Sequence, residues 1–395
     1  MIKCIRCKKV NSISKAGKVR NLQRYYCRHC NLHFTKGPAL DKEPARKAMV
    51  TLQDIAFKLG LSATTVSKAL LNKPDISEAT RKKVQELAGQ LDYRPNILAQ
   101  GLRKSKTNVI GIIVPELNNN FFSSIIMGAQ EIVSVKGFNV LIAQSAESYD
   151  TEVANVKQLI ANRVDGVLIS VTSETKNFEH FTTFGKYGIP IVFFNRICES
   201  IDTPKVVVND YDGAFRAVEQ LIGQGCTRIA HIAGPNNLLL SKKRLEGYRD
   251  ALKKHQLPAK EEWLVYCDLS QENAKACARQ LLSLRRKPDA IFAVNDPVGI
   301  QVILTGKENG IRIPEELCVI GFSNDPVSGI IEPGLSTMAQ PTKEIGRAAA
   351  GILLDMIENK PGAAGLSVLK IIDAELIVRK SSDKNYRDPI NAVRS

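Results

Sequence analysis

Four cysteines near the N-terminus have the spacing of metal ligands. They form two CxxC pairs separated by 19 residues: Cys4, Cys7, Cys27 and Cys30. Each pair can place two sulfurs on one side of a tight turn, and two pairs complete the tetrahedron that Zn²⁺ prefers. A segment of about 37 residues buries too little apolar surface to fold alone, so the metal would stabilise it. The sequence therefore predicts a structural zinc ribbon over residues 1–37 with one Zn²⁺ per chain, and His29 and His33 are expected to be bystanders.

The same segment mixes basic and aromatic side chains, which suits contact with a nucleic acid. Phosphates attract Lys and Arg, and aromatic rings stack on bases or sugars. The side chains of these two kinds include Lys8, Lys9, Lys15, Lys18, Arg20, Arg24, Arg28, Tyr25, Tyr26 and Phe34. The alternative is a structural ribbon with no ligand of its own. Residues 38–48, which contain two prolines and mixed charge, are predicted to be a linker.

The net charge of +15 lies in the first quarter of the chain. Residues 1–107 contain 23 Lys and Arg against 7 Asp and Glu, whereas the other 288 residues contain 32 against 33. A basic head on a neutral body indicates a polyanionic partner for the head. No apolar run approaches the ~20 residues of a membrane helix and no secretory signal is visible, so the expected location is the cytoplasm.

The remaining cysteines are scattered singly through apolar surroundings. They are predicted to be buried free thiols of a reducing compartment. These residues are Cys198, Cys226, Cys267, Cys277 and Cys318. A chain of 395 residues exceeds what one core usually organises, so two or three folded units are expected.

Residues 51–91 have the pattern of three short helices. Apolar residues recur at helical spacing up to Leu59, and Gly60 supplies the positive φ that ends the first helix. Ser62 and Ser77 are predicted to cap the second and third helices. The second helix has a small, polar outer face, which is typical of a helix that enters the major groove of DNA.

A fourth helix is predicted to form only conditionally. Pro95 and Asn96 open the segment PNILAQGLR, which ends at Arg103, and Gly101 weakens it as a helix. A helix of under ten residues is marginal alone in water. The alternative is a flexible linker.

From residue 108 onward, continuous Val, Ile and Leu runs alternate with amphipathic helical stretches. This alternation predicts parallel sheets covered on both faces, and about 270 residues suffice for two similar lobes. Ligands of such sheets bind at the carboxyl ends of the strands. Polar residues follow the apolar runs at 116–122, 195–196, 209–210, 295–296 and 323–324.

These strand ends favour binding without turnover, so an enzyme is not expected. No dinucleotide, Walker-type or nucleophile-elbow motif follows a strand, and His180, His231 and His255 are isolated. Amides, carboxylates and guanidinium groups instead suit bidentate hydrogen bonds to vicinal hydroxyls, and aromatic faces suit a sugar ring.

Residues 50–380 resemble the lactose-repressor (LacI/GalR) family of transcriptional regulators, first through TLQDIAFKLGLSATTVSKALLNKPDISEATRKKVQELAGQLDYRPNILAQGLR and then through a body like a sugar-binding protein. The ribbon departs from that family, whose members usually begin almost where Met49 stands; it is either an added module or the product of an upstream start. The motif YYCRHCNLHF resembles zinc ribbons at the start of some transposase proteins.

The resemblance assigns DNA-binding residues. Ala63 and Thr64 occupy the positions that read base edges, and Leu102 matches a leucine that is levered between base pairs in the minor groove. The other matching positions are Thr65, Ser67, Lys68, Asn72, Asn96 and Arg103.

The resemblance also assigns an effector site in the cleft. Phe121 and Phe122 match an aromatic wall, and the polar clamp matches Asn195, Arg196, Arg244, Asn295 and Asp296. Two departures point to a less polar pocket. Ser323 stands at an effector-binding position where an Asp is common, and Leu238, Leu239 and Leu240 replace a more polar stretch.

The expected organisation is a zinc ribbon (1–37), a linker (38–48), a helix-turn-helix domain (49–95), a hinge helix and linker (96–107), a two-lobed α/β effector-binding and dimerisation domain (108–380) and a polar tail (381–395). The predicted function is a cytoplasmic repressor of carbohydrate-related genes. A homodimer would bind a pseudo-palindromic double-stranded DNA operator, and a sugar or sugar derivative in the cleft would alter the order of the hinge helix. The alternatives are a solute-binding protein, against which the basic head and missing signal peptide argue, and a transposition-associated DNA protein built around the ribbon.

Overall fold

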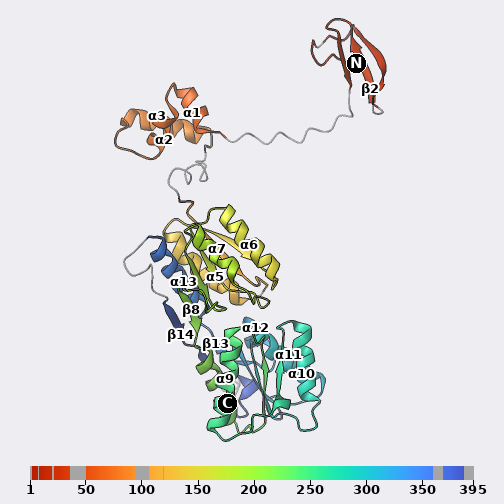
Figure 1. Ribbon diagram of the computed structural model, residues 1–395, viewed down its shortest axis with the longest axis vertical. Coiled ribbons are helices and arrows are strands. Elements are labelled where there is room, and N and C mark those ends of the chain that lie inside the picture. The colour runs from red at the N-terminus through yellow and green to blue at the C-terminus, as the bar shows by residue number, and fades with distance from the viewer. Residues whose placement is uncertain are drawn as a thin grey trace, which may run out of the picture. The chain divides into compact units, whose positions relative to one another are not determined.

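The computed structural model describes residues 2–7, 9–19, 22–35, 50–93, 106–118, 120–358 and 368–386 (Figure 1). The chain divides into two compact units, residues 1–96 and residues 97–395. The first unit contains a small sheet and a three-helix domain, and the second contains two α/β lobes. The predicted hinge helix lies outside the described residues.

The N-terminal residues form a three-stranded antiparallel sheet with the order β1-β2-β3. The strands are β1 (Ile13–Val19), β2 (Leu22–Cys27) and β3 (Leu32–Thr35). Among the described residues, their buried core contains two cysteines and one phenylalanine: Cys4, Cys27 and Phe34. A core of this size cannot hold a small sheet together by apolar burial alone.

Residues 50–93 fold as a three-helix domain, here called the headpiece, with α1 (Leu52–Leu59), α2 (Ala63–Leu70) and α3 (Glu78–Gln90). Both predicted caps are confirmed, because the hydroxyls of Ser62 and Ser77 accept backbone N–H groups of the helices that they begin. Gly60 ends α1 with a φ of 63°, as predicted. The helices enclose an aliphatic core of Ile55, Ala56, Val66, Ala69, Val84 and Ala88.

The first lobe contains a six-stranded parallel sheet with the order β14-β8-β7-β6-β4-β5. The strands are β4 (Val109–Val114), β5 (Asn139–Gln144), β6 (Gly166–Ile169), β7 (Ile191–Phe194), β8 (Lys205–Val208) and β14 (Leu369–Ile372). Helices α5 (Asn120–Val135) and α13 (Thr342–Ile357) pack against one face, and α6 (Tyr149–Ala161) and α7 (Glu179–Lys186) against the other.

Helices α5 and α13 cross at two glycines. A Cβ on Gly128 would lie 2.2 Å from the carbonyl oxygen of Lys343, and a Cβ on Gly346 would lie 2.0 Å from that of Ile125. Because such distances are far below contact, only glycine permits this close helix packing.

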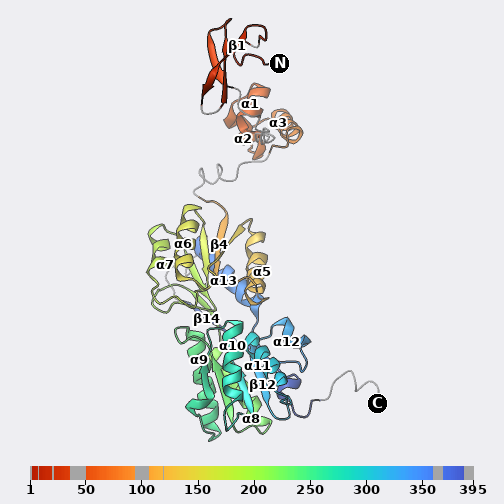
Figure 2. The same ribbon diagram turned by 90° about the vertical axis from the view of Figure 1, so that its right-hand side faces the viewer.

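The second lobe (Figure 2) contains a six-stranded sheet. The order of its strands is β10-β9-β11-β12-β13-β15. The strands are β9 (Ile229–Ala233), β10 (Leu264–Tyr266), β11 (Ala290–Ala293), β12 (Cys318–Ser323), β13 (Ser336–Ala339) and β15 (Glu375–Ile377), of which β15 is antiparallel. Helices α8 (Asp210–Gly223) and α9 (Leu239–Lys254) cover one face, and α10 (Gln271–Leu282) and α11 (Asp296–Glu308) the other. The short elements are α12 (Pro326–Ile330), η1 (Glu261–Trp263) and η2 (Lys380–Ser382).

Within the described residues, the chain passes between the lobes at three places. These are Asn209 between β8 and α8, residues 340–341 between β13 and α13, and residues 373–374 between β14 and β15. The side-chain amide of Asn209 donates to the carboxylate of Asp373 at 3.0 Å, which joins two of the crossings. Each lobe is therefore built from separate stretches of sequence, so neither lobe is a contiguous half of the body.

The predicted fold class is confirmed for the headpiece and the two-lobed body. The five scattered cysteines are buried and free, as predicted, and Trp263 is fully buried. None of the described helices is long and apolar enough to cross a membrane. The predicted polar tail differs at its start, because Ser381 and Ser382 are fully buried in the second lobe, where their hydroxyls bond to the Val319 carbonyl and the Ser336 hydroxyl.

Candidate functional site

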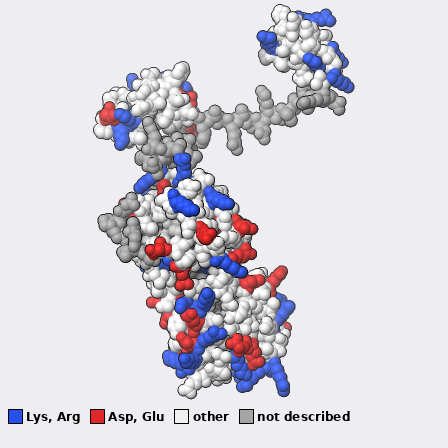
Figure 3. Space-filling view, viewed as in Figure 1, with Lys and Arg blue, Asp and Glu red and all other residues white. Residues whose placement is uncertain are grey.

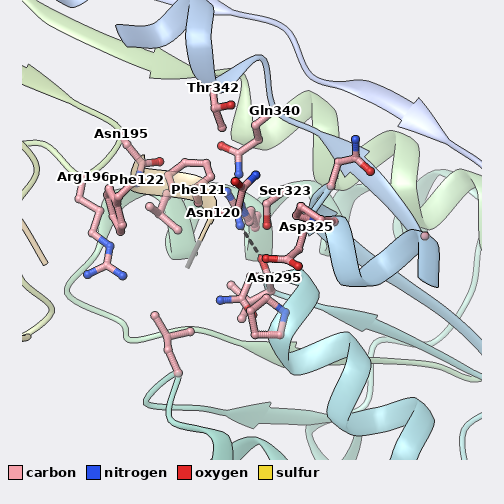
Figure 4. Close-up of a pocket in the computed structure, with 18 of the residues that line it drawn as sticks. Asn120, Phe121, Phe122, Asn195, Arg196, Asn295, Ser323, Asp325, Gln340 and Thr342 are labelled. Carbon is pink, nitrogen blue, oxygen red and sulfur yellow. Dashed lines mark hydrogen bonds between the residues drawn. The ribbon is translucent and has the colours of Figure 1, made fainter. Parts of the chain in front are cut away.

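A cavity of about 490 Å³ lies between the two lobes of the body. Both lobes contribute to it from the carboxyl ends of their strands and from the starts of the helices that follow. The lining residues from the first lobe and the crossing are Asn120, Phe121, Phe122, Asn195, Arg196, Gln340 and Thr342 (Figure 4). Those from the second lobe include Leu240, Arg244, Leu269, Val294, Asn295, Pro297, Ser323, Asn324, Asp325 and Arg379.

The first lobe supplies an aromatic wall at the start of α5. The rings of Phe121 and Phe122 meet edge to face, with centroids 5.1 Å apart. Asn195 and Arg196 follow β7, and Asn195 has a φ of 56°, a backbone conformation that asparagine tolerates better than most residues.

Arg196 is held in place by a carboxylate. Its Nη1 donates to both oxygens of Glu147, at 2.7 and 3.0 Å, and its guanidinium carbon lies 5.8 Å from the centroid of the Phe122 ring. Although burial acts to raise the pKa of Glu147, the Arg196 guanidinium holds it below its ordinary value. The fixed guanidinium keeps further N–H groups for a ligand.

Arg244 lines the cavity from α9, and each of its three guanidinium nitrogens contacts the protein. It is 3% exposed, two of its nitrogens contact Asp210 at 2.7 and 2.8 Å, and a third donates to the carbonyl of Val294. The guanidinium also lies over the Phe322 ring at 3.7 Å. Burial raises the pKa of Asp210, and the neighbouring Arg244 opposes that shift. Each of the two buried charges is thus paired with the other. Arg244 therefore fixes the wall of the cavity more than it offers free donors.

The loop after β12 is strained where it reaches the cavity. Ser323 has a φ of 134° and Asn324 a φ of 60°. A residue with a side chain rarely adopts such angles, and backbone strain of this kind gathers at binding sites. Asn295, after β11, uses its side-chain oxygen to cap α11 through the N–H of Val298 at 3.0 Å, which leaves its NH₂ group for the cavity.

The assignment of Asp296 to the polar clamp is corrected by the structure. Asp296 is fully buried and is not among the lining residues. Its carboxylate accepts hydrogen bonds from the hydroxyls of Ser328 and Thr337, at 2.7 and 2.6 Å, and from the backbone of Asp325 at 2.8 Å. Burial raises its pKa, and these donors oppose that shift. Asp296 ties together the loops behind the cavity wall and does not reach the cavity itself.

Sequence reasoning missed several lining residues, of which Gln340 is the most informative. It is 8% exposed, lies on a crossing between the lobes, and its side-chain oxygen has no hydrogen-bond partner within the described part of the chain. A buried acceptor without a partner is costly, and a ligand donor in the cavity would satisfy it. The available signal was its position, because a polar residue directly follows the apolar end of β13.

The leucine run at the start of α9 joins the lobes. Leu238 and Leu240 belong to the same buried apolar cluster as Ile197 and Val171 of the first lobe, and Leu240 also lines the cavity. Asn237 next to them donates to the backbone of Ser173 across the same boundary. The departure noticed in the sequence therefore adds apolar surface between the lobes.

The predicted DNA-binding residues of the headpiece lie on and beside α2. Ala63, Thr64 and Lys68 are exposed, whereas Thr65 and Ser67 are half-buried. Lys68 pairs with Asp75 at 2.5 Å. Asn72 is exposed, has a φ of 52°, and accepts a hydrogen bond from Gln85 at 2.9 Å. Asn96, Leu102 and Arg103 lie outside the described residues.

The structure brings the four N-terminal cysteines together. All four Sγ atoms lie within 4.8 Å of one another, with Cys4 and Cys30 at 3.5 Å and Cys7 and Cys27 at 3.6 Å. The backbone N–H of Cys7 holds the pKa of the Cys4 thiol below its ordinary value, which favours a thiolate. Burial and the neighbouring sulfurs raise the pKa of Cys30 to about 12, since thiolates repel one another unless a cation lies between them. His29 and His33 are outside this cluster.

Two family models match the chain. The model described as bacterial regulatory proteins, lacI family, matches residues 51–96, and that of a periplasmic binding protein-like domain matches residues 218–382. Both ranges begin after the four-cysteine cluster. The HTH-type transcriptional repressor CytR of Escherichia coli (strain K12) is 31% identical over 86% of this chain and 98% of the relative. Catabolite control protein A of Priestia megaterium is 30% identical over 77% of this chain and 91% of the relative.

Solved structures have the same architecture. A complex of the transcriptional regulator CelR with cellobiose is 28% identical, with a TM-score of 0.65 over 84% of this chain and 99% of that one. The lac repressor dimer bound to operator and the anti-inducer ONPF has a TM-score of 0.75 over 85% of this chain and 99% of that one. At 23% identity, this second likeness shows the fold alone.

Proposed function

The chain belongs to the lacI family of bacterial regulatory proteins, and from this premise we propose that it is a repressor whose operator binding responds to a small ligand. The observation that carries the proposal is the cavity between the lobes, which residues of both lobes line. The same chain also contains a helix-turn-helix headpiece. A ligand that contacts both lobes favours one arrangement of them over another. Such a protein acts in the cytoplasm, where it meets DNA, as a homodimer on a pseudo-palindromic site.

In the proposed complex, the first turns of α2 enter the major groove. The exposed methyl group of Ala63 suits contact with a thymine methyl, and the hydroxyl of Thr64 can hydrogen-bond to a base edge. Thr65, Ser67, Lys68 and Asn72 would support base or phosphate contacts. Asn96, Leu102 and Arg103 would act in the minor groove, where an inserted leucine bends the duplex and so increases the contact area.

The lining of the cavity favours a sugar or sugar derivative. Asn195, Asn295 and Gln340 offer planar amides for vicinal hydroxyls, and Phe121 and Phe122 offer apolar faces for a ring. CelR, one of the similar structures, holds cellobiose. Coupling of 1 to 3 kcal/mol between this site and the headpiece would change operator affinity by about 5 to 150-fold.

We also propose that the four cysteines bind one structural Zn²⁺. Sulfur ligands about 2.3 Å from a tetrahedral zinc lie about 3.8 Å from each other. The observed Sγ–Sγ distances are close to this value, at 3.5 Å for Cys4 and Cys30 and 3.6 Å for Cys7 and Cys27. Four sulfur ligands fill the coordination sphere, so the metal would supply stability and no open position for a reaction.

One experiment tests the regulatory function. Selection of bound sequences from a random duplex pool, with and without a panel of sugars, should yield a symmetric site whose occupancy changes with one compound. Thr64→Ala should weaken binding to that site, and Gln340→Ala should weaken the response to the sugar while the site is still bound. Lys157→Gln, an exposed change on the body, serves as the matched control.

Three outcomes would contradict the proposal. A chain that binds sugars without selecting any DNA sequence would support solute capture. Loss of specific binding on deletion of residues 1–48 would assign recognition to the ribbon, whereas the repressor function predicts that specific binding largely survives. Unchanged operator affinity in Leu102→Ala would reject the proposed minor-groove role of that residue.

A further inference from the structure

The first forty residues contain ten Lys and Arg and no Asp or Glu. The first acidic residue of the chain is Asp41, so no basic side chain of the ribbon has a carboxylate on the ribbon to pair with. The headpiece and body differ, since many of their cations form ion pairs, such as Lys68 with Asp75 and Lys254 with Glu219. The visible ribbon surface accordingly shows blue side chains and no red ones (Figure 3).

The two faces of the ribbon sheet have different roles. Cross-strand pairing places Ile13, Cys27 and Leu32 in one row, on the face where Phe34 and the cysteines are buried. The same pairing places Ser14, Tyr26 and His33 in a row on the opposite face, because alternate residues of a strand point to opposite sides. No described residue of the chain covers this second face, since its His33 is exposed and its Ser14 and Tyr26 are half-buried.

This second face, here called the open face, carries hydrogen-bonding groups and the positive charge of Arg24. Arg24 lies two residues before Tyr26 on β2 and therefore shares its face. The rings of Tyr26 and His33 lie 4.6 Å apart, and the Tyr26 hydroxyl is fixed by a hydrogen bond to Asn31 at 2.9 Å. Lys15 and Lys18 are exposed on the neighbouring edge strand, where they pair with Tyr25 and Gln23 and so extend from the other side of the sheet. The ribbon therefore carries cations on both sides of its sheet.

The length of chain between the ribbon and the headpiece limits where the ribbon can act. Fourteen residues, 36–49, separate β3 from the first described residue of the headpiece. A fully extended chain of that length spans at most about 50 Å, because each residue adds 3.3–3.6 Å. At 3.4 Å per base pair, this reach corresponds to about 15 base pairs of duplex.

We propose, on the basis of the operator binding proposed above, that the ribbon contacts the phosphate backbone of duplex DNA beside the operator. Lys15, Lys18 and Arg24 are the side chains assigned to these contacts. A surface that has cations and no carboxylates complements a phosphate backbone, and the contact needs no base sequence. Duplex is favoured over single strands because the rings of Tyr26 and His33 already pack against each other, at an interplanar angle of 35°, so fewer ring faces remain for bases.

The test measures how affinity depends on flanking DNA and on salt. Two duplex probes carry the selected operator, one trimmed to its ends and one extended by 15 base pairs on each side. The full-length chain should bind the extended probe more tightly, whatever the sequence of the flanks. The triple variant Lys15→Gln, Lys18→Gln, Arg24→Gln should lose this gain and still bind the trimmed probe as the unaltered chain does.

The expected size of the effect follows from counterion release. Each lost phosphate contact lowers the slope of log affinity against log salt by about 0.9, so three contacts lower it by about 2.7. On the extended probe, the advantage of the unaltered chain over the triple variant should therefore shrink about 40-fold between 50 and 200 mM salt. The matched control Lys157→Gln, Lys186→Gln, Lys242→Gln removes the same charge from exposed positions of the body and should keep the original slope.

A measurement without any variant guards against misfolding. Hydroxyl-radical footprinting of the unaltered chain should show protected sugars in the flanks, outside the headpiece footprint. Equal affinity for both probes together with unprotected flanks would overturn the inference, even if the operator itself is bound. Tighter binding when only single-stranded flanks are attached would also overturn it, in favour of a single-strand site. Failure to bind the trimmed probe would instead contradict the operator binding proposed above.

Discussion

The ribbon and the headpiece are both small, but they are held together in different ways. In the ribbon, two cysteines and Phe34 are the buried core, and the four sulfurs converge on one point. In the headpiece, six aliphatic side chains are buried and nine further apolar residues pack around them. A chain of this size folds without a metal only when its helices enclose such a core. The comparison shows how two modules of similar length solve the same problem with different chemistry.

The largest difference between the modules should appear when the metal is removed. A chelator, or Cys27→Ser, should abolish zinc binding and unfold the ribbon, because structural zinc contributes about 10–16 kcal/mol of binding free energy in small zinc domains. Zinc content and amide hydrogen exchange of β1–β3 measure this, and the headpiece should keep its protection. Cys277→Ala, a buried thiol outside the cluster, is the control and should retain one zinc per chain. If the ribbon amides stayed protected from exchange after the metal was removed, the ribbon would not differ from the headpiece in its need for metal.

The converse prediction concerns the core of the headpiece. Ile55 is fully buried, so Ile55→Ala should lower the free energy of unfolding of the headpiece by about 2–5 kcal/mol, through lost burial and a cavity. Zinc content should not change. Chemical unfolding followed by hydrogen exchange of α1–α3 measures the effect. Phe57→Ala on the same helix is the control, since Phe57 is 90% exposed and its truncation should change stability little.

A smaller effect should come from the helix cap. The hydroxyl of Ser62 accepts the N–H of Thr65 at 3.0 Å, and Ser62→Ala should cost about 1 kcal/mol of headpiece stability. Ser62→Asn should restore most of that loss, because asparagine also caps helices well. Equal stability of the Ser62→Ala and Ser62→Asn variants in thermal unfolding would show that the cap contributes nothing measurable.

The smallest expected effect is the loss of headpiece stability in acid through the protonation of Asp54. Hydrogen bonds from the backbone N–H and hydroxyl of Thr51 lower the pKa of Asp54. A carboxylate whose pKa is lower in the folded state stabilises it above the unfolded pKa of about 3.9, and the contribution is lost as pH falls through the folded pKa. Asp54→Asn should therefore reduce headpiece stability at neutral pH and leave it nearly unchanged in strong acid.

The ribbon should respond to acid by another route. It contains no carboxylate, so its stability should fall where its thiolates are protonated and release zinc. Unfolding of both modules, followed by hydrogen exchange across a pH series, separates the two responses. A ribbon that keeps its zinc in acid strong enough to protonate Asp54 would contradict this expectation.

Local sequence patterns were sufficient to predict much of the headpiece. The caps at Ser62 and Ser77, the end of α1 at Gly60 and the apolar faces of the helices all depend on residues within one or two turns. The capping box formed by Thr51 and Asp54 is equally local, because its two residues are three positions apart. The body was predicted as two α/β lobes because buried parallel strands appear as continuous apolar runs.

The roles of cleft residues could not be derived in the same way. Polar residues follow several strands, and the sequence does not distinguish those that face the cavity from those that bond internally. Asp296 follows this pattern, and Arg244 is assigned by the family resemblance alone. The carboxylate of Asp296 is engaged by Ser328 and Thr337, 32 and 41 residues away, and the guanidinium of Arg244 by Asp210, 34 residues away.

The order of residues along the chain thus determined the class of fold, the positions of the caps, the pairing of two CxxC motifs and the charge of the ribbon, because each depends on near neighbours or on composition. The tertiary structure alone decided that the lobes are assembled from separate stretches. It also decided that Gln340 lies buried in the cavity with an oxygen to which no described residue donates a hydrogen bond. The physical reason is that hydrogen-bond partners and burial are set by side chains that are distant in sequence and adjacent only after folding.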